Sequence, residues 1–387
     1  MKICFLMDSV NALGGAQKCT ITIANELIKK NDVTIICTDN IPETKRVYHQ
    51  IDANIKIVYI KWHNTFNSVL NIWTRLFKLI NNNTNLLLKK KKLLTYIYYE
   101  KSNKKIKELQ KYIDDNKFDC IVGVGAIHTM ILSLLKKNNN EKFIGWQHST
   151  TERYFRLKGQ FLWHQDCIFK DALKNLDNYV VLTDIDKLKI KEYFNFDAIK
   201  ISNPLSFECS MNINKSREKI ILAVGRYNKV KGYDMLIKAF EIFSKTNQNY
   251  ILRIVGDGQE RNNLQELATK LNLQEKIQLS GMSNNVIDEY MKADFFALSS
   301  LVEGFPMVLL EAMECGLPIV TFDLPCVHEI LNDQCGNIVE YMNIEALADA
   351  MLKLADVQDK KNIRNACHEQ ASKFKVKNII KEWEKIL

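Results

Sequence analysis

Two cations and two carboxylates in the second half of the chain are of the types that bind a ligand carrying both phosphate and hydroxyl groups. Arg226 and Lys231 lie five residues apart, in a loop that follows an apolar, β-rich run ending at Gly225. An arginine can hold a diphosphate through two hydrogen bonds and a lysine adds a point charge, and both stabilise charge on a departing phosphate. Glu303 and Glu311 can accept hydrogen bonds from neighbouring sugar hydroxyls. The simpler alternatives are solvated loop cations and a Glu311 that pairs with a nearby cation.

A predicted helix between these two carboxylates offers a further site for an anion. Pro306 suits the first turn of a helix, and Gly316 suits its end. The first backbone N–H groups of a helix have no partner inside the helix and attract phosphate. We expect such groups near Phe305, Met307 and Val308.

The first half of the chain holds a histidine and a glycine pair at predicted strand ends. His148 follows the strand-like run 142–146, and His128, after an earlier run, is interpreted as structural. Gly14 and Gly15 lie at a strand-to-helix turn, where glycine lets a ligand or another backbone approach closely. A plain tight turn explains the glycine pair equally well. No third glycine follows it, which argues against a dinucleotide-dependent dehydrogenase.

The elements that must position these residues alternate between apolar, β-rich runs and helical patterns, as in parallel βαβ units. In the first half we predict strands at Lys2–Met7, Val33–Cys37, Ile55–Ile60, Asp119–Val124, Lys142–Trp146 and Tyr179–Leu182. In the second half we predict Lys219–Val224, Tyr250–Val255, Lys276–Ser280, Asp294–Leu298 and Pro318–Thr321. The predicted fold is α/β, with two Rossmann-like domains facing an inter-domain cleft, which favours an enzyme with two substrates.

The domain boundary is predicted near Pro204, before the polar stretch Glu208–Glu218. Residues 1–203 then form the first domain and residues 204–374 the second. The amphipathic helix 375–387 is assigned to the first domain.

The positive charge of this 387-residue chain is concentrated in one segment. The formal net charge is +9, and the segment from Lys61 to Lys117 contains 13 Lys or Arg but only 4 Asp or Glu. A predicted amphipathic helix over 67–80 and the run Lys89–Lys92 interleave cations with Leu, Trp and Tyr. This pattern suits an anionic membrane surface, to which each nearby cation contributes about 1 kcal/mol. A solvated basic face over an ordinary core is the alternative, and no pattern typical of nucleic-acid binding supports a third.

Several other classes of protein are disfavoured. No apolar run approaches the ~20 residues that span a bilayer, and the N-terminus has too short an apolar core for a signal peptide. None of the ten cysteines forms a CxxC pair, so we expect neither disulfides nor a zinc site. The sequence has no Walker A motif and no GxSxG, which excludes P-loop ATP hydrolysis and nucleophile-elbow hydrolysis.

The chain resembles glycosyltransferase family 4 in three motifs. They are Gly225-Arg226 with Lys231-Gly232, Gly256-Asp257-Gly258, and Glu303-Gly304-Phe305-Pro306 with Glu311-Ala312-Met313 and Gly316-Leu317-Pro318. The resemblance is most specific from Ile220 to Ile330 and negligible between about Ile41 and Phe118. It implies the GT-B fold and retention of the donor's anomeric configuration. Gln17 stands where many relatives carry Glu.

The resemblance also implies roles for particular residues. Arg226 and Lys231 would hold the donor diphosphate, Glu311 the ribose hydroxyls and Glu303 the donor sugar, with His148 near the anomeric centre. The implied catalytic residues are His148, Arg226, Lys231 and Glu303. The implied donor-binding residues are Gly15, Gly225, Arg226, Lys231, Gly256, Glu303, Gly304, Phe305, Met307, Val308 and Glu311. No metal and no cofactor are expected beyond the nucleotide-sugar donor.

These roles predict a retaining, metal-independent hexosyltransferase. It would move a hexose or N-acetylhexosamine from a UDP-sugar to a lipid-linked glycan in the synthesis of a bacterial surface polysaccharide such as capsule or O-antigen. The first domain would bind the acceptor and the second the donor. The basic segment 61–117 would place the protein in the cytoplasm, on the inner face of the plasma membrane. GDP in place of UDP, a UDP-N-acetylglucosamine 2-epimerase and a non-catalytic sugar-binding scaffold remain as alternatives.

Overall fold

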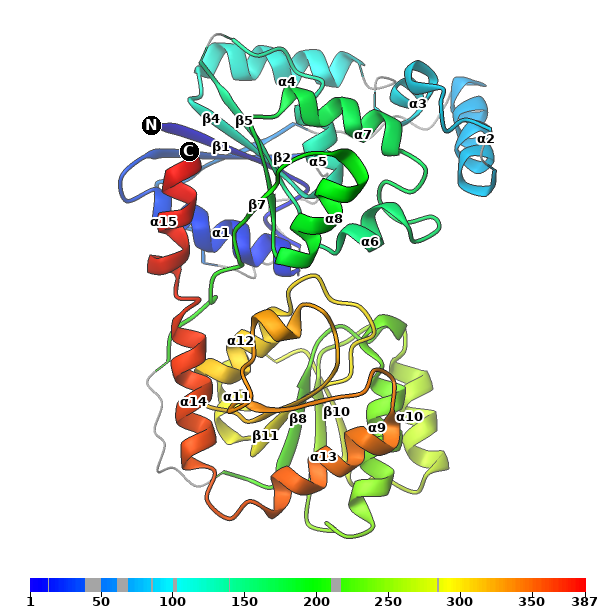
Figure 1. Ribbon diagram of the computed structural model, residues 1–387, viewed down its shortest axis with the longest axis vertical. Helices are drawn as coiled ribbons and strands as arrows, with labels where there is room; N and C mark the ends of the chain where they lie inside the picture. The colour runs from blue at the N-terminus through cyan, green and yellow to red at the C-terminus, as the bar shows by residue number, and fades with distance from the viewer. Residues whose placement is uncertain are drawn as a thin grey trace. The chain divides into compact units, whose positions relative to one another are not determined.

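The structure is a computed structural model, and the chain in it forms two compact units (Figure 1). Unit 1 comprises Met1–Pro204 with Val376–Leu387, and unit 2 comprises Leu205–Lys375. The described residues are 1–12, 14–38, 50–60, 69–84, 86–99, 103–138, 140–209, 217–283 and 285–387. The start of the predicted basic segment, residues 61–68, therefore lies outside the described residues.

Unit 1 is built on a seven-stranded sheet in the order β3-β2-β1-β4-β5-β6-β7. Every strand pair described in it is parallel. The strands are β1 (Lys2–Met7), β2 (Asp32–Cys37), β3 (Lys56–Tyr59), β4 (Cys120–Val124), β5 (Lys142–Trp146), β6 (Asn178–Val181) and β7 (Ile199–Lys200). Because buried parallel strands are covered on both faces, they read as continuous apolar runs in the sequence.

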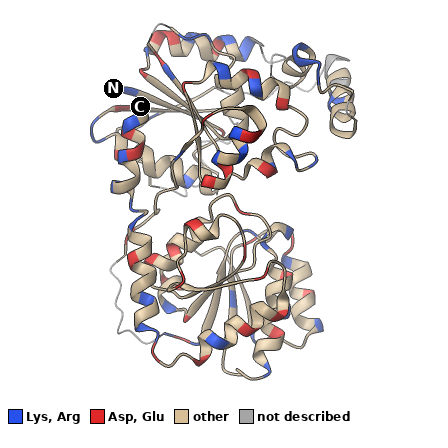
Figure 2. Cartoon of the chain, in the orientation of Figure 1, with Lys and Arg blue, Asp and Glu red and all other residues tan. Residues whose placement is uncertain are grey.

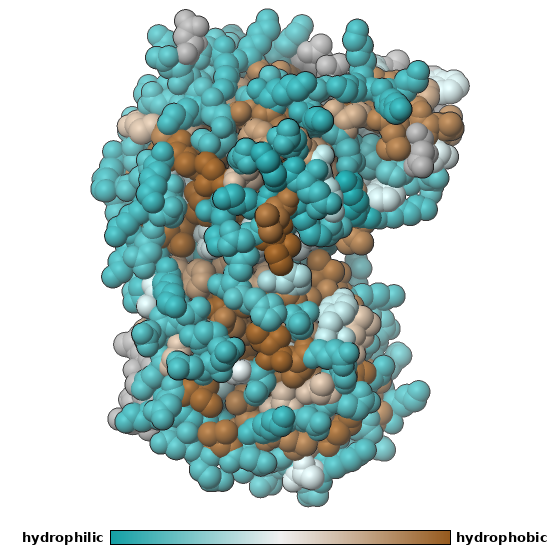
Figure 3. Space-filling view, in the orientation of Figure 1, coloured by the Kyte–Doolittle hydropathy of each residue, from teal (hydrophilic) through white to brown (hydrophobic). Residues whose placement is uncertain are grey.

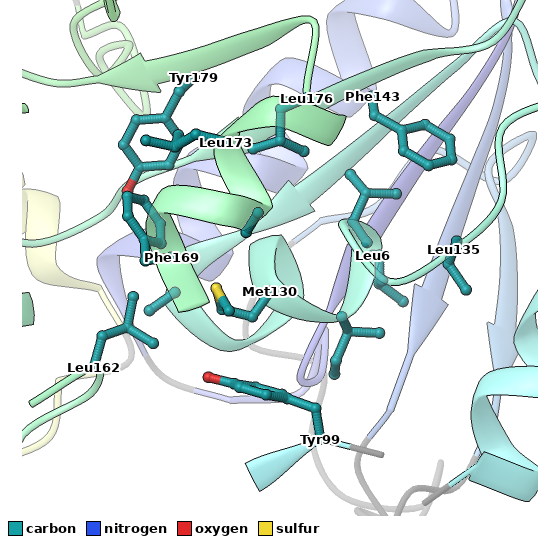
Figure 4. Close-up of a cluster of buried hydrophobic side chains, with 14 of the residues drawn as sticks. Leu6, Tyr99, Met130, Leu135, Phe143, Leu162, Phe169, Leu173, Leu176 and Tyr179 are labelled. Carbon is teal, nitrogen blue, oxygen red and sulfur yellow. The ribbon is translucent and has the colours of Figure 1, made fainter. Parts of the chain in front are cut away.

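Helices cover both faces of this sheet. They are α1 (Gly15–Leu27), α2 (Val69–Asn83), α3 (Lys91–Tyr98), α4 (Asn103–Asn116), α5 (Gly125–Leu132), α6 (Thr151–Phe155), α7 (Asp166–Ala172), α8 (Asp184–Phe194) and α15 (Val376–Ile386), with the short 3₁₀ helix η2 (Leu173–Asn175). On one face, Leu6 and Phe143 pack with Met130 of α5 and Phe169 of α7, and Tyr99 closes the cluster beside α3 (Figure 4). This core ties α3, and through it α2, to the sheet.

The C-terminal helix α15 belongs to unit 1 because its tryptophan packs on the other face of the sheet. The Trp383 ring meets the Trp146 ring at the end of β5 edge-to-face, with centroids 4.6 Å apart, and both side chains are fully buried. Lys30 and Glu384 add an ion pair of 3.1 Å beside α1. The chain thus returns to its first unit after completing the second (Figure 1).

Unit 2 is built on a six-stranded parallel sheet in the order β10-β9-β8-β11-β12-β13. The strands are β8 (Ile220–Val224), β9 (Ile251–Val255), β10 (Ile277–Gly281), β11 (Phe295–Leu298), β12 (Ile319–Phe322) and β13 (Gly336–Val339). The helices are η3 (Lys229–Lys231), α9 (Tyr233–Ser244), α10 (Arg261–Lys270), α11 (Val286–Lys292), α12 (Met307–Glu314), η4 (Val327–Glu329), α13 (Ile344–Asp356) and α14 (Lys361–Ser372).

The expectation of two parallel-sheet, Rossmann-like domains is confirmed. All eleven predicted strands occur, with ends displaced by at most one residue. The edge strands β7 and β13 were not predicted. Strand β7 has only two residues, which is too short for a recognisable pattern, and β13 begins with Gly336-Asn337, which are not apolar. The predicted helix over 67–80 corresponds to α2, of which the structure describes the part from Val69 onward.

Replacing Gly336 with alanine tests how tightly the edge of the unit 2 sheet is packed. Gly336 has φ +150°, and a Cβ there would lie 1.9 Å from the carbonyl oxygen of Ile319 on β12. Since that oxygen belongs to the sheet backbone, we expect Gly336→Ala to lower the free energy of unfolding by about 2–4 kcal/mol. Chemical denaturation measures the loss.

The matched control for this variant is Gly159→Ala. Gly159 also has a positive φ, of +72°, but nothing lies within 4 Å of a Cβ built on it. The control measures how much the positive φ alone lowers the free energy of unfolding, which we expect to be about 1 kcal/mol. Equal losses for the two variants would contradict the close contact at Ile319.

Candidate functional site

The charged residues predicted from the sequence gather where the strand order of unit 2 reverses. Chain order runs outward from β8 through β9 to β10 on one side, and from β11 through β12 to β13 on the other. Open α/β sheets bind ligands beyond the carboxyl ends of their strands at such a switch point. Lys231 follows β8 and Glu303 follows β11, so both lie at this point.

The backbone after β8 is shaped to hold Lys231 close to the loop after β11. Asn228 caps η3, its side chain accepting a hydrogen bond from the Lys231 N–H at 3.2 Å. Gly232 has φ +59°, and a Cβ there would lie 2.2 Å from the carbonyl oxygen of Ser299. The hydroxyl of Ser299 in turn donates to the Lys231 carbonyl at 2.9 Å. The Lys231-Gly232 pair therefore needs glycine at its second position for the two loops to meet.

Lys231 and Glu303 form an ion pair across the switch point. The Lys231 Nζ donates to Glu303 Oε1 at 2.6 Å, and the two side chains are only 20% and 14% exposed. Partial burial weakens solvent screening, so this pair is stronger than a surface salt bridge. Arg226 lies on the same loop and is exposed. Lys231 and Glu303 are thus brought together, and Arg226 adds a second cation near them in the sequence.

Gly256 allows the loops after β8 and β9 to come into contact. It has φ +142°, and a Cβ on it would lie 2.0 Å from the carbonyl oxygen of Gly225. A Cβ on Gly225 would meet the Tyr233 hydroxyl at 2.7 Å and Lys231 Cε at 3.2 Å. Two of the predicted glycines are therefore required by close packing around Lys231.

The predicted helix after Glu303 is α12, which begins at Met307. Pro306 is its N-cap, and among the described residues no side-chain hydrogen bond caps this end. Gly304, Phe305 and Met307 are buried. The Phe305 ring packs on Phe374 with centroids 5.8 Å apart, so that side chain serves the core. The helix therefore begins where the sequence predicts one, and anion binding by its first N–H groups stays a prediction.

Glu311 lies inside unit 2. Its side chain is 4% exposed, accepts a hydrogen bond from the Ser206 hydroxyl at 2.8 Å and another from the Tyr290 hydroxyl at 2.9 Å. Two of the contacts of Glu311 are therefore with hydroxyl groups of its own unit. Sequence reasoning missed Ser206 and Tyr290, because residues 105 and 21 positions away carry no motif that links them to Glu311.

In unit 1, His148 follows β5 as predicted and its ring is held by aromatic packing. The imidazole lies on Trp146 with ring centroids 4.2 Å apart, and Nε2 is buried with no hydrogen-bond partner among the described residues. The backbone N–H of His148 donates to the Tyr154 hydroxyl at 3.2 Å. Burial lowers the pKa of His148 to about 3, so the ring is neutral at neutral pH.

His128 and Gly15 lie nearer to the switch point of unit 1. His128 is buried, with Nε2 at 2.9 Å from the Thr38 hydroxyl and Nδ1 at 3.1 Å from the Val124 carbonyl oxygen. These contacts fit its interpretation as a structural histidine, and burial lowers its pKa. Gly15 begins α1 and is exposed, with Gly14 as the N-cap in extended conformation.

The carboxylates after β6 hold local structure. Asp186 accepts hydrogen bonds from the Thr183 hydroxyl at 2.7 Å and the Thr151 N–H at 2.6 Å, and Asp184 pairs with Lys200. In the part of the chain that the structure describes, no three or more His, Cys, Asp or Glu side chains form a group that could hold a metal ion. Within the same residues, none of the helices combines the length and the apolar character needed to cross a bilayer.

Residues 210–374 match the family model described as glycosyl transferases group 1. Unit 2 contains a glycosyl transferases group 1 domain. The match spans the Lys231–Glu303 pair, the close-packed glycines and α12. The switch point of unit 2 therefore lies within the matched residues.

Two curated glycosyltransferases align with the full length of the chain. An uncharacterized glycosyltransferase of Haemophilus influenzae is 27% identical over 100% of this chain and 99% of its own. A Campylobacter jejuni enzyme is 25% identical over 100% of this chain and 98% of its own. That enzyme is described as an α-1,4-N-acetyl-D-galactosaminyltransferase acting on GalNAc-α-(1→4)-GalNAc-α-(1→3)-diNAcBac-PP-undecaprenol.

Solved glycosyltransferase structures share the fold of the whole chain. Staphylococcus aureus TarM, solved with Fondaparinux, α-GlcNAc-glycerol and UDP, has a TM-score of 0.79 and 15% identity, over 100% of this chain and 99% of TarM. Anabaena HepE, solved with UDP, has a TM-score of 0.71 and 16% identity, over 100% and 99% of the two chains. The GT-B fold expected from the sequence is therefore confirmed.

The depressed pKa of His148 predicts a loss of stability in mild acid. The pKa is lower in the folded chain than the ordinary value of about 6.5 in the unfolded chain, so the neutral ring favours folding above that pH. As pH falls below about 6.5 toward 3, the unfolded chain takes up a proton first and stability declines. At pH 5.0 we expect a cost of about 1–2 kcal/mol.

Comparing wild type with His148→Phe measures this cost. The variant removes the titrating ring but keeps an aromatic side chain on Trp146, so its stability should fall less between pH 7.5 and pH 5.0. Urea denaturation at both pH values gives the difference. An identical fall in the two proteins would show that the His148 ring is not held neutral by the fold.

Proposed function

We propose that the chain is a retaining, metal-independent glycosyltransferase that moves a hexose or N-acetylhexosamine from a UDP-sugar to a lipid-linked glycan in bacterial surface polysaccharide synthesis. The observation that carries the proposal is the Lys231–Glu303 pair at the switch point of a glycosyl transferases group 1 domain. A cation for phosphate and a carboxylate for sugar hydroxyls are thereby placed within one hydrogen bond of each other.

The donor would bind along the loops after β8, β9 and β11. Arg226 and Lys231 neutralise the diphosphate, and the N-terminus of α12 adds its positive helix dipole. Glu303 accepts hydrogen bonds from hydroxyls of the sugar, and Glu311 accepts hydrogen bonds from those of the ribose. The solved relatives TarM and HepE were crystallised with UDP, which supports UDP as the nucleotide.

The proposed reaction is a displacement on the face from which UDP departs. The acceptor hydroxyl forms a bond to the anomeric carbon while the bond from that carbon to the UDP oxygen breaks, and the departing phosphate takes the hydroxyl proton. Lys231 and Arg226 stabilise the charge that develops on UDP, which is the largest catalytic contribution in this scheme. His148 presents its neutral imidazole ring to the donor sugar.

A lipid-borne acceptor is supported by the Campylobacter jejuni relative, whose name specifies an undecaprenol-diphosphate glycan. The geometry of α2 supports contact with a membrane. Trp73, Leu76 and Leu79 on its outer face are 56%, 45% and 59% exposed, and Leu86 after the helix is 74% exposed. Figure 3 shows this apolar surface over α2. Isolated exposed apolar residues are ordinary, but four along one helix and its following turn mark an interaction surface.

The charge around α2 fits an anionic bilayer. Lys89, Lys90 and Lys92 are exposed in the segment that follows α2, and Figure 2 shows this basic patch at α3 beside the largely uncharged α2. The inner face of α2 is fixed to unit 1, because the Asn81 side chain donates to the Tyr98 hydroxyl at 3.2 Å. The outer face of α2 would therefore insert as part of a fixed element, next to the lysines that meet lipid phosphates.

A thermal-shift panel of UDP, GDP and ADP tests the donor assignment. A ligand present at about 100 times its dissociation constant adds about 2.7 kcal/mol to the folded state. We expect UDP to raise the melting temperature selectively, and equally in EDTA and in Mg²⁺. A selective rise with GDP would mean that the donor is a GDP-sugar in place of a UDP-sugar. No rise with any nucleotide would favour the non-catalytic scaffold.

Removing the charge of Lys231 should lower turnover, while the protein stays folded. We expect Lys231→Ala to reduce the rate of UDP release about 100- to 1,000-fold, because the leaving diphosphate loses its partly buried cation. Lys229→Ala is the matched control, since Lys229 lies on the same 3₁₀ helix but is exposed. Near-normal turnover of Lys231→Ala would refute the proposed role.

Replacing the outer face of α2 tests membrane contact. The triple variant Trp73→Ser, Leu76→Ser, Leu79→Ser should bind vesicles of phosphatidylcholine with 30% phosphatidylglycerol at least about 100-fold more weakly, because each side chain loses its apolar burial. The control variant Leu188→Ser removes an exposed leucine from α8. Flotation at physiological salt is the measurement. Unchanged binding of the triple variant, or no binding of wild type, would contradict a membrane-bound α2.

A further inference from the structure

Glu311 is held from two sides by hydroxyl groups that no sequence motif marks. Oε1 accepts a hydrogen bond from the Ser206 hydroxyl at 2.8 Å, and Oε2 accepts one from the Tyr290 hydroxyl at 2.9 Å. The carboxylate lies within α12, one turn past its first residue, Met307. One donor on each oxygen fixes the plane of the carboxylate as well as its position.

Tyr290 can act in this contact only as a donor. Its side chain is fully buried at the end of α11, and its ring packs near Phe296 and Phe207, with centroids 5.9 Å and 6.4 Å away. Burial, together with the neighbouring Glu311 carboxylate, raises the pKa of Tyr290, so the hydroxyl keeps its proton across the physiological range. The aromatic packing therefore presents a constant hydrogen-bond donor to Oε2.

Ser206 belongs to a short segment that runs along α12. Its neighbour Leu205 donates its N–H to the Phe374 carbonyl at 2.7 Å, and the Cys209 N–H donates to the Glu314 carboxylate at 3.1 Å. Residues 205–209 are thus fastened at both ends, and Ser206 lies between these points. The hydroxyl of Ser206 is held in place by the backbone of its own segment.

We propose that Tyr290 and Ser206 are positioning residues that orient the Glu311 carboxylate toward the ribose hydroxyls of the donor nucleotide. The inference rests on the proposed function, in which Glu311 binds the ribose. A carboxylate offers about four acceptor positions on its two oxygens, and the two hydroxyls take one on each. A pre-oriented carboxylate loses less freedom when the ligand binds, which increases affinity.

Positioning differs from simple burial of a carboxylate in its effect on ligand selectivity. A buried carboxylate requires hydrogen bonds wherever it lies, so stability alone cannot separate the two roles. Selectivity between two ligands that differ only at the ribose does separate them. If Tyr290 orients Glu311, its removal lowers the preference for ribose hydroxyls and leaves diphosphate binding unchanged.

The experiment measures the dissociation constants of UDP and 2′,3′-dideoxy-UDP by titration calorimetry on the full chain. Wild type should prefer UDP. Tyr290→Phe, which keeps the ring but removes the hydroxyl, should lower this preference about 3- to 10-fold, the equivalent of one hydrogen bond. Ser206→Ala should lower it in the same direction, and it tests the proposal independently if Tyr290→Phe fails to fold.

Tyr250→Phe is the matched control. Tyr250 is also a buried tyrosine of unit 2 whose hydroxyl donates to a carboxylate, Asp294 Oδ2, at 2.7 Å. This control should lose stability to a similar degree and keep the wild-type preference for UDP.

The outcomes separate this inference from the proposed function. A preference for UDP that is unchanged in both Tyr290→Phe and Ser206→Ala overturns the positioning role, as does wild type that binds both nucleotides equally. If wild type binds neither nucleotide, the donor assignment itself fails, and the inference fails with it. A reduced preference in Tyr290→Phe and Ser206→Ala, with Tyr250→Phe unchanged, establishes it.

Discussion

A partly buried pair of opposite charges organises the candidate site. Lys231 and Glu303 come from loops 72 residues apart, and their 2.6 Å contact joins the carboxyl ends of β8 and β11 at the point where the strand order reverses. Each charge would be costly to bury alone, and each neutralises the other while no ligand is bound. In the proposed function, a phosphate would replace Glu303 as the partner of Lys231 and leave the carboxylate available to sugar hydroxyls. One pair would thereby prepare both halves of a nucleotide-sugar site.

The surrounding structure is what allows this pair to form. Gly232 brings the backbone of η3 against Ser299, and Gly256 brings the loop after β9 against Gly225, at distances that no Cβ would permit. Behind the pair, α12 holds Glu311 between Ser206 and Tyr290. Charge, close backbone approach and buried hydrogen bonds therefore reinforce one another around the same strand ends.

The sequence predicts the sheet well for a physical reason. Parallel strands that are covered on both faces are apolar runs of four to six residues, so their positions emerge within one residue, whereas the edge strands β7 and β13 lack such runs. Lys231, Glu303 and His148 could also be placed at strand ends from the sequence alone. Their environments could not, because these depend on distant residues: the Trp146 ring beside His148 packs on Trp383, and Glu311 receives its hydrogen bonds from Ser206 and Tyr290. Motifs identify side chains that can bind a ligand, and topology decides what holds them.

Glycosyl transfer at this site is tested most simply by the rate of UDP release from UDP-hexoses and UDP-N-acetylhexosamines in EDTA, with and without a short polyprenyl-diphosphate-linked glycan as acceptor. A glycosyltransferase with this donor site should show saturable release from at least one of these donors, accelerated by the acceptor and insensitive to EDTA. Release that ignores the acceptor and yields a free, altered sugar would contradict glycosyl transfer. No release from any UDP-sugar would contradict the donor site built around Lys231 and Glu303.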